Sequence, residues 1–166
     1  MQIQNRKKKM KMNAVEQSYL EKAEQLCASA EQCTSSVRRK LADWGCPIEM
    51  MPKIVDKLVA TGFVDESRYV KAYCESKAFS QKWGRIKIQS MLRQKHIGGE
   101  LIAKAVKEID DERYRAVLRE VAEEKWKTCQ VADPMRSRGK LMAFLASRGY
   151  ESEVVQEVVQ DIINKK

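Results

Sequence analysis

Three ten-residue stretches decide the fold: VRRKLADWGC at 37–46, IQSMLRQKHI at 88–97 and LMAFLASRGY at 141–150. Each contains two apolar residues four positions apart, which is the spacing of one helix face. The second of these apolar residues is Leu41, Leu92 or Leu145. Four positions later stand Gly45, His96 and Gly149, each followed by an apolar residue. Glycine commonly ends a helix in the left-handed conformation, and an apolar residue beyond it packs back on the last turn. Each stretch is therefore predicted to be a helix with its C-terminal cap.

Two further helices are expected around each of these stretches. After each cap, apolar residues recur at positions i, i+1, i+4 and i+5, as in the run from Ile54 to Val59, and this spacing gives a short helix one buried stripe. Before each stretch lies another amphipathic run, at 13–30, 65–78 and 111–126. The unit is a three-helix repeat of about 50 residues. We assign His96 a structural role, because a non-glycine residue can occupy such a cap at a cost.

The predicted fold is all-α, with three tandem three-helix repeats. The expected divisions are a basic flexible N-terminal tail at 1–12 and repeats at 13–62, 63–109 and 110–166. One repeat of this size buries too little core to be stable alone, so neighbouring repeats should stack into an elongated, curved array. Residues 128–137, which include Asp133-Pro134, are expected to form a loop inside the third repeat.

The composition excludes several classes of protein. Only 7 Gly and 3 Pro occur in 166 residues, too few for the frequent turns of a β-sandwich or barrel. No run of about 18 apolar residues is present, so we expect a cytoplasmic protein that does not enter a membrane. The 5 cysteines lack C-x-x-C spacing, which favours reduced thiols over disulfides or zinc. His96 is the single histidine and the usual phosphate-loop, dinucleotide and nucleophile motifs are missing, so we expect no enzymatic activity, metal or cofactor.

Positive charge is concentrated in a few places along the chain. The net charge is +9, and the segment 77–99 contains basic residues but no acidic one. The second helix of each repeat carries cations on faces opposite its leucine row, which predicts a positive stripe that attracts nucleic acid or an acidic protein surface. The residues expected to bind a partner are Arg38, Arg39, Lys77, Lys82, Trp83, Arg85, Lys87, Arg93, Lys95, Arg136, Lys140 and Arg148.

Two interpretations of Trp83 are open at this stage. The indole could stack on a base or form a hot spot for a protein partner. It could equally fill the junction between the first and second helices of its repeat.

Several of these motifs together resemble a known family. The segments GFVDESRY at 62–69, WGRI at 83–86 and LRQKHI at 92–97 resemble the signature of the RecX family, the bacterial regulators of the RecA recombinase. FLASRGY at 144–150 is similar to the family's final repeat, and RRKL at 38–41 to its first. The likeness runs from about Tyr19 to Ile162. The sequence departs from the family pattern at His96, where the family usually has glycine, and in the basic N-terminal tail.

The resemblance implies a non-enzymatic protein that binds RecA filaments on DNA. Such a protein lodges in the filament groove and restrains strand exchange, with ATP hydrolysis inhibited as a consequence, in recombination, DNA repair and the SOS response. We expect a monomer that binds single- or double-stranded DNA only weakly by itself.

The residues alone also support a stand-alone DNA-binding protein, because three-helix units are similar to helix-turn-helix folds. Such a protein would bind duplex DNA tightly without the recombinase. A scaffold for uncharged peptides is a third reading, which the acid-free block at 77–99 disfavours.

Overall fold

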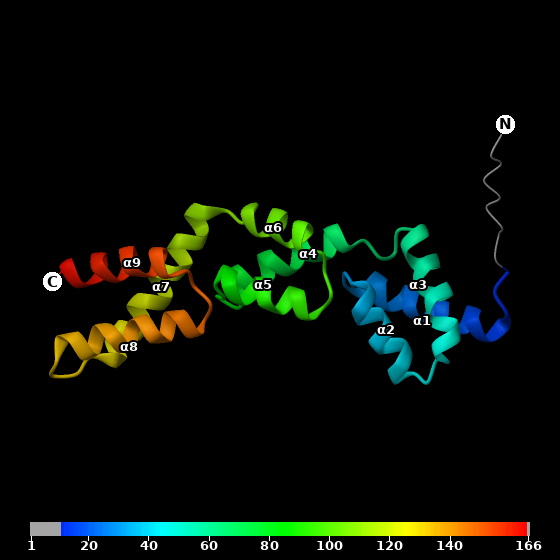
Figure 1. The fold of residues 1–166 in the computed structure, drawn as a ribbon, viewed down its shortest axis with the longest axis horizontal. Coiled ribbons are helices and arrows are strands. Elements are labelled where there is room, and N and C mark those ends of the chain that lie inside the picture. Colours follow the sequence, from blue (N-terminus) through cyan, green and yellow to red (C-terminus); the bar gives the residue numbers. More distant parts are fainter. Residues whose placement is uncertain (1–10, 166) are drawn as a thin grey trace, which may run out of the picture. The chain divides into compact units, whose positions relative to one another are not determined.

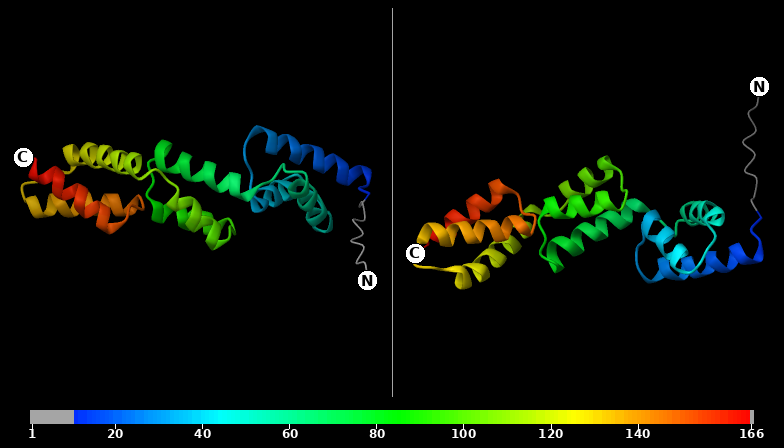
Figure 2. Two further views of the ribbon diagram at one scale, coloured as in Figure 1. Left: turned by 90° about the horizontal axis from the view of Figure 1, so that it is seen from above. Right: turned by 60° about the horizontal axis from the view of Figure 1, so that its bottom comes forward.

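The chain folds entirely into helices over the part that the structure describes. A computed structural model describes residues 11–165, and within that range no strand occurs. Figure 1 shows the succession of helices from α1 to α9, and Figure 2 gives two further views. The all-α prediction is therefore confirmed. The predicted basic tail at 1–12 lies outside the described residues except for Lys11 and Met12.

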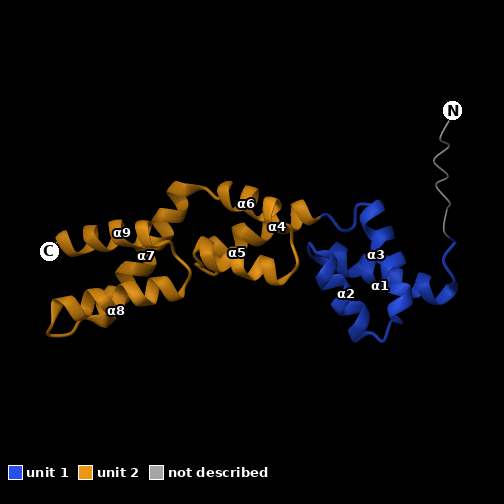
Figure 3. Cartoon of the chain, viewed as in Figure 1, with its two compact units in different colours: residues 1–65 blue, residues 66–166 orange. Residues whose placement is uncertain are grey.

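By contact the chain divides into two compact units, residues 1–65 and 66–166 (Figure 3). The first contains α1 (Ala14–Ser29), α2 (Thr34–Asp43), the short 3-10 helix η1 (Ile48–Met50) and α3 (Met51–Ala60). Its core includes Leu20, Val37, Leu41, Ile54 and Leu58. The start of α1 is fixed by Asn13 and Glu16, each of which accepts a hydrogen bond from the other's backbone N–H. This capping box satisfies amides that would have no partner inside the helix.

The second unit holds two sets of three α-helices, and the first set also includes a π-helix. The first set comprises α4 (Glu66–Glu75), the π-helix η2 (Ser76–Ser80), α5 (Arg85–Gln94) and α6 (Gly99–Lys107). The second set comprises α7 (Asp111–Cys129), α8 (Pro134–Ser147) and α9 (Ser152–Asn164), which pack on one another. Their cores are built from the predicted rows, since Ile88, Leu92, Leu141 and Leu145 are all fully buried. The predicted repeat boundaries at 62 and 109 and the curved array stay predictions.

The three predicted caps share one geometry. The backbone N–H of Cys46, Ile97 or Tyr150 donates to the carbonyl of the leucine five residues earlier, at 2.9, 3.4 and 3.3 Å. Gly45, His96 and Gly149 take positive φ angles of 78°, 59° and 85°. This arrangement is the Schellman motif, in which a left-handed residue lets the last carbonyls of a helix find donors. The structural role of His96 is confirmed, because its backbone adopts the conformation of the two glycines.

One predicted loop is shorter than expected. We predicted an irregular segment at 128–137, but α7 continues to Cys129 and α8 already begins at Pro134. The reason is local: the Asp133 side chain accepts the Met135 N–H at 2.9 Å, and proline suits the first helical position. Buried Ser137 also accepts the Val131 N–H at 2.9 Å, which fixes the remaining connection.

Two features are absent from residues 11–165: a helix that could span a membrane and a cluster of side chains that could bind a metal ion. None of the helices there is long and apolar enough to cross a membrane. No cluster of three or more His, Cys, Asp or Glu side chains in that range could hold a metal ion.

Candidate functional site

The start of α5 lies against the end of α8, which joins the two helix sets of the second unit. The Gly84 N–H donates to the Arg148 carbonyl at 2.8 Å, and the Ile86 N–H donates to the Gly149 carbonyl at 3.0 Å. Between them, the Arg85 N–H donates to the Tyr114 hydroxyl of α7 at 2.9 Å. The first amides of a helix have no partner inside it, so α7 and α8 supply the acceptors that α5 lacks.

Two glycines allow this close approach. A Cβ atom on Gly84 would lie 2.0 Å from the carbonyl carbon of Gly149. A Cβ atom on Gly149 would lie 2.3 Å from the Cβ of Lys87. No side chain fits at either position without moving the backbone. We refer to this contact as the Gly84–Gly149 junction.

Arg85 is held inside the same junction. Its guanidinium group lies 3.9 Å from the centroid of the Tyr114 ring and pairs with Asp111 at 3.0 Å and Glu151 at 3.2 Å. Its side chain is 15% exposed. The Tyr114 hydroxyl donates a hydrogen bond to Glu151. Burial is the main cause that raises the pKa of Tyr114, and this hydrogen bond raises the pKa further. The Tyr114 hydroxyl therefore keeps its proton. It accepts from the Arg85 N–H and donates to Glu151, so it links Arg85 to the turn before α9.

Lys82 and Arg148 are also engaged within the chain. The Lys82 ammonium group pairs with Glu120 of α7 at 2.8 Å. The backbone carbonyl of Lys82 accepts from the Tyr150 hydroxyl at 2.9 Å and from Arg148 Nε at 3.2 Å. Arg148 Nη2 donates to the backbone carbonyl of Gln81 at 2.7 Å. Burial raises the pKa of Tyr150 to about 12, so this hydroxyl keeps its proton at neutral pH. The end of α8 thus holds the segment between η2 and α5.

These contacts correct one expectation from the sequence. The segment 77–99 lacks acidic residues along the chain, but the fold brings Asp111, Glu120 and Glu151 to Lys82 and Arg85. The expected position of Arg85 on a solvent-facing stripe is wrong, because two carboxylates and an aromatic ring surround its guanidinium group. That Lys82, Arg85 and Arg148 bind a partner stays a prediction.

The remaining predicted cations lie on more accessible surfaces. In the first unit, Arg38 and Arg39 are exposed on α2. In the second unit, Arg93 is exposed and donates to Gln89 at 3.3 Å, while Lys95 is half-buried at the end of α5. On α8, Arg136 and Lys140 are exposed. Their role in binding a partner also stays a prediction.

Lys77, Trp83 and Lys87 come together with Tyr73, which the sequence reasoning missed. The Lys77 Nζ lies 4.7 Å from the centroid of the Trp83 ring and 5.4 Å from that of Tyr73, and the Lys87 Nζ lies 4.2 Å from the Trp83 centroid. All four side chains are half-buried. We call these four residues the lysine–aromatic cluster. The i, i+4 spacing of Tyr73 and Lys77 was a signal that could have revealed the fourth member.

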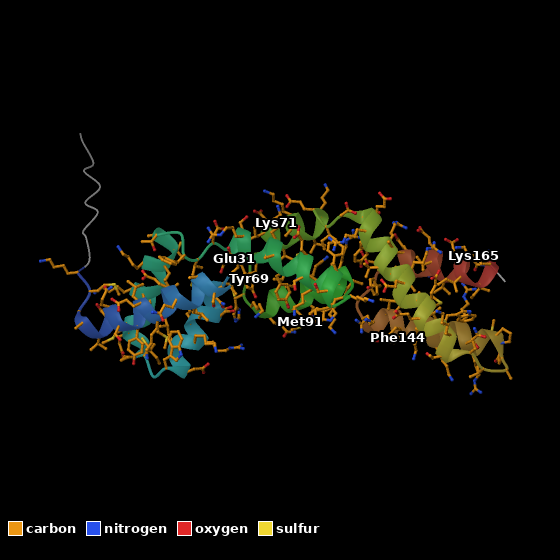
Figure 4. All side chains as sticks on the ribbon, turned by 180° about the vertical axis from the view of Figure 1, so that it is seen from behind. Glu31, Tyr69, Lys71, Met91, Phe144 and Lys165 are labelled. Atoms are coloured by element: carbon orange, nitrogen blue, oxygen red, sulfur yellow. The ribbon has the colours of Figure 1, made fainter. Side chains whose placement is uncertain are left out.

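The π-helix explains how the cluster forms. Its wider turn ends with the Gln81 N–H donating to the Ser76 carbonyl at 3.1 Å, after which Lys82 takes a positive φ of 54°. The chain therefore reverses, and the Trp83 N–H donates to the Lys77 carbonyl at 2.9 Å. This reversal places the indole beside the Lys77 side chain. Figure 4 shows the side chains of this region, with Tyr69 labelled on α4 and Met91 on α5.

Two cavities in the second unit are lined by α8. One, of about 310 Å³, lies among Lys82, Val121, Glu124, Lys125, Phe144 and Arg148. The other, of about 400 Å³, is mainly apolar and includes Ile86, Met142, Ala146, Tyr150 and Val155. In the first cavity, the Lys125 Nζ lies 5.0 Å from the centroid of the Phe144 ring, which is labelled in Figure 4.

Comparison with known proteins identifies similar chains. Residues 65–106 match the model of the second three-helix domain of RecX, and residues 111–159 match that of the third. The regulatory protein RecX of Pseudomonas fluorescens is 30% identical over 134 residues, which cover 81% of this chain and 84% of that protein. The regulatory protein RecX of Chlorobaculum tepidum is 26% identical over 149 residues, covering 90% and 91%.

A solved structure has a similar fold. The crystal structure of a regulatory protein RecX superposes with a TM-score of 0.79 at 20% identity, covering 86% of this chain and 72% of that one. The two matched domains correspond to the helix sets that meet at the Gly84–Gly149 junction.

Proposed function

This chain belongs to the RecX family of regulatory proteins, and on that premise we propose that it binds the filament of a RecA recombinase on DNA and restrains its activity. The observation that carries the proposal is the pair of domain matches, which span both helix sets of the second unit. The relatives named above match over most of their length, so the likeness is not confined to one helix set.

We propose that the chain acts by occupying a surface of the filament and not by catalysing a reaction. If the tandem repeats stack as predicted, they would present an extended surface, which would suit the continuous groove of a filament better than a small substrate. A chain lodged in that groove would restrain the movements that strand exchange requires, and ATP hydrolysis would fall as a consequence. The proposed setting is recombination, DNA repair and the SOS response in the cytoplasm, with the protein acting as a monomer.

The proposed contact surface uses the cations that the fold leaves accessible. Arg38 and Arg39 of α2, Arg93 of α5, and Arg136 and Lys140 of α8 are exposed, so they can meet phosphates or carboxylates of the filament. Lys82, Arg85 and Arg148 would act differently. Their contacts with carboxylates and carbonyls hold the two helix sets together, so they position the surface.

Co-sedimentation with the cognate recombinase tests this proposal. The chain should pellet with recombinase filaments assembled on single-stranded DNA and remain in solution with DNA alone at moderate salt. The opposite pattern would overturn the proposal: nanomolar binding to duplex DNA without the recombinase, and no association with the filament, would identify a stand-alone DNA-binding protein.

A further inference from the structure

The mainly apolar cavity of about 400 Å³ lies where α5, α8 and α9 meet, and it continues onto an exposed apolar surface. Ile86 of α5, Ala146 of α8 and Val155 of α9 line it together. Ile86 is 53% exposed, and Ala143 and Ala146 are exposed as well. A single apolar side chain on a surface is common, but one at the edge of an apolar cavity enlarges a contiguous patch, which indicates a binding surface. We call this cavity and its exposed edge the α8 groove.

The polar side chains that line the α8 groove are already engaged within the chain. The Tyr150 hydroxyl donates to the Lys82 carbonyl at 2.9 Å, and the Ser152 hydroxyl accepts from the Gln156 side-chain amide at 3.4 Å. Sites for small molecules combine apolar walls with polar groups that fix the orientation of the ligand. The lining of this groove therefore suits the apolar side chains of a larger partner better than a polar small molecule.

The edge of the α8 groove is positively charged. Neither α5 nor α8 contains an acidic residue. On α8, Arg136 and Lys140 are exposed, and neither forms an ion pair with a residue in the range 11–165. They precede Ala143 by seven and three positions, and this helical spacing places them beside it on α8. Two cations therefore flank the apolar surface.

Most of the negative charge of α9 is used elsewhere. Glu157 pairs with Arg115 at 2.6 Å and Asp161 pairs with Arg119 at 2.7 Å, so both carboxylates are directed at α7. Glu153 lies in the first turn of α9, where the helix dipole favours a negative charge. An apolar groove beside exposed cations complements a partner that combines apolar and acidic side chains.

The backbone around the α8 groove determines which conformation the partner takes. An extended peptide docks by pairing its backbone N–H and C=O groups with a sheet edge, and residues 11–165 contain no strand. Here the walls are helices, whose backbone groups already pair along their own axes. A partner helix satisfies its own backbone and presents its apolar residues in one row. The groove therefore fits an amphipathic helix.

We propose that the α8 groove binds an acidic amphipathic helix of the recombinase, with the apolar row of that helix against Ile86 and Ala146 and its carboxylates at Arg136 and Lys140. The small side chain of Ala146 lets the partner helix approach closely. Ile86 and Ala146 belong to different helix sets, so one bound helix contacts both sets beside the Gly84–Gly149 junction. This inference rests on the proposed function and deepens it, because it names the part of the recombinase that this surface recognises.

The first test fills the α8 groove without changing any charge. Binding of the full-length chain to recombinase filaments on single-stranded DNA is measured by co-sedimentation. Ala143→Gln/Ala146→Gln places polar side chains in the groove, and α8 should stay intact because glutamine forms helices well. The Kd for the filament should rise by about tenfold or more, as expected when apolar anchors lose their pocket. Binding to naked single-stranded DNA should not change.

A matched variant controls for the substitution itself. Ala72 of α4 and Ala103 of α6 are exposed alanines of the same unit outside the lining of the groove. Ala72→Gln/Ala103→Gln should change the Kd for the filament by less than about threefold, because most surface residues contribute little to binding.

The charged edge is tested separately. Arg136→Gln/Lys140→Gln should raise the Kd for the filament by about fivefold or more at moderate salt, because it removes the partners of the carboxylates. Lys71 of α4, labelled in Figure 4, and Lys104 of α6 are exposed lysines outside the groove. Lys71→Gln/Lys104→Gln removes the same charge and should change the Kd by less than about threefold.

A photo-crosslinking amino acid identifies the occupant of the groove. Benzoylphenylalanine in place of Ser152, which is exposed in the lining, should link to a recombinase subunit in the filament. Mass spectrometry should locate the link in a helix that carries acidic residues beside an apolar row. The same group in place of Ala103 should not link to that helix.

Three results would overturn the inference and leave the proposed function standing. One is wild-type filament binding by Ala143→Gln/Ala146→Gln. Another is an equal loss of binding in a test variant and its matched control. The third is a cross-link from position 152 to DNA, to a second copy of this chain or to a recombinase segment without acidic residues.

Failure of the proposed function has a different signature, because the wild-type chain itself would then not pellet with the filament, and the inference would fall with it. Circular dichroism checks that each variant is folded. If Ala143→Gln/Ala146→Gln unfolds, the cross-link from position 152 decides the question.

Discussion

Single residues determine how closely the helices of the second unit approach one another. At the Gly84–Gly149 junction, the requirement for glycine has two different origins. Gly149 takes a positive φ of 85°, which few other residues adopt, and its Cα also faces Lys87. Gly84 has an ordinary φ of −74°, so its requirement is purely steric. Substitution of Gly84 therefore isolates the contact between the two helix sets from backbone strain.

Gly84→Ala should lower the free energy of unfolding by about 1 to 3 kcal/mol, the usual cost of overpacking, because its Cβ would overlap the Gly149 backbone. Urea unfolding followed by circular dichroism measures this change. Gly139→Ala is the matched control, because Gly139 lies inside α8 with open space around its Cα. Alanine there should increase stability by about 0.5 to 1 kcal/mol. Similar effects at the two glycines would contradict the proposed close contact.

His96 offers a second test at the scale of one residue. It adopts a φ of 59° in a cap where the other two helices have glycine. His96→Gly should raise the free energy of unfolding by about 0.5 to 1 kcal/mol, because glycine removes the strain of the left-handed conformation. His96→Ala should give no such gain, since alanine keeps the Cβ atom. A thermal melt in which both variants are equally stable would show that the cap is not strained.

At the scale of helices, α5 combines a buried face with a polar first turn. Ile88 and Leu92 are fully buried, whereas Arg85 at the start of the helix binds acidic groups from α7 and from the turn before α9. The buried face was predictable, because apolar residues four positions apart are a local pattern. The acidic partners were not, since Asp111 and Glu151 lie 26 and 66 residues from Arg85 in the sequence. The π-helix was also missed, because nothing in the local spacing distinguishes η2 from the end of α4.

Leu92→Ala should destabilise the second unit by about 2 to 5 kcal/mol, the range for a buried leucine, since Leu92 is 0% exposed. Ile86→Ala on the same helix is the control, because Ile86 is 53% exposed and loses little burial. The midpoint of urea unfolding distinguishes the two. If Leu92→Ala unfolded at the wild-type midpoint, the alignment of the leucine rows would be incorrect.

Arg85→Glu should also destabilise the second unit, by about 2 kcal/mol or more, because it places a carboxylate beside Asp111 and Glu151. Arg38→Glu is the comparison, since Arg38 is exposed on α2, and its effect should stay within about 0.5 kcal/mol. Thermal unfolding measures both. A stable Arg85→Glu variant would restore the view that Arg85 is a solvated cation available to a partner.

At the scale of the whole molecule, the sequence predicted the fold more completely than the candidate site. The three caps and leucine rows are short-range features that led to the all-α repeat fold, and the motifs at 62–69, 83–86 and 92–97 led to the RecX family. The division of cations into accessible and internal ones depends on how α7 and α8 pack against α5, which no local pattern reveals. Trp83 illustrates this limit, because its two lysine neighbours come from η2 and α5 on either side of a chain reversal.

The ATPase rate of the cognate recombinase filament on single-stranded DNA, titrated with the full-length chain, tests the central claim most directly. We predict that the rate falls with increasing chain and saturates below one chain per recombinase subunit, because we propose that one chain of tandem repeats occupies more than one subunit of the filament groove. Arg38→Glu/Arg39→Glu, which reverses exposed charges of α2, should shift the titration to higher concentration without unfolding the protein. An ATPase rate that stays unchanged while the chain saturates naked DNA would contradict the account.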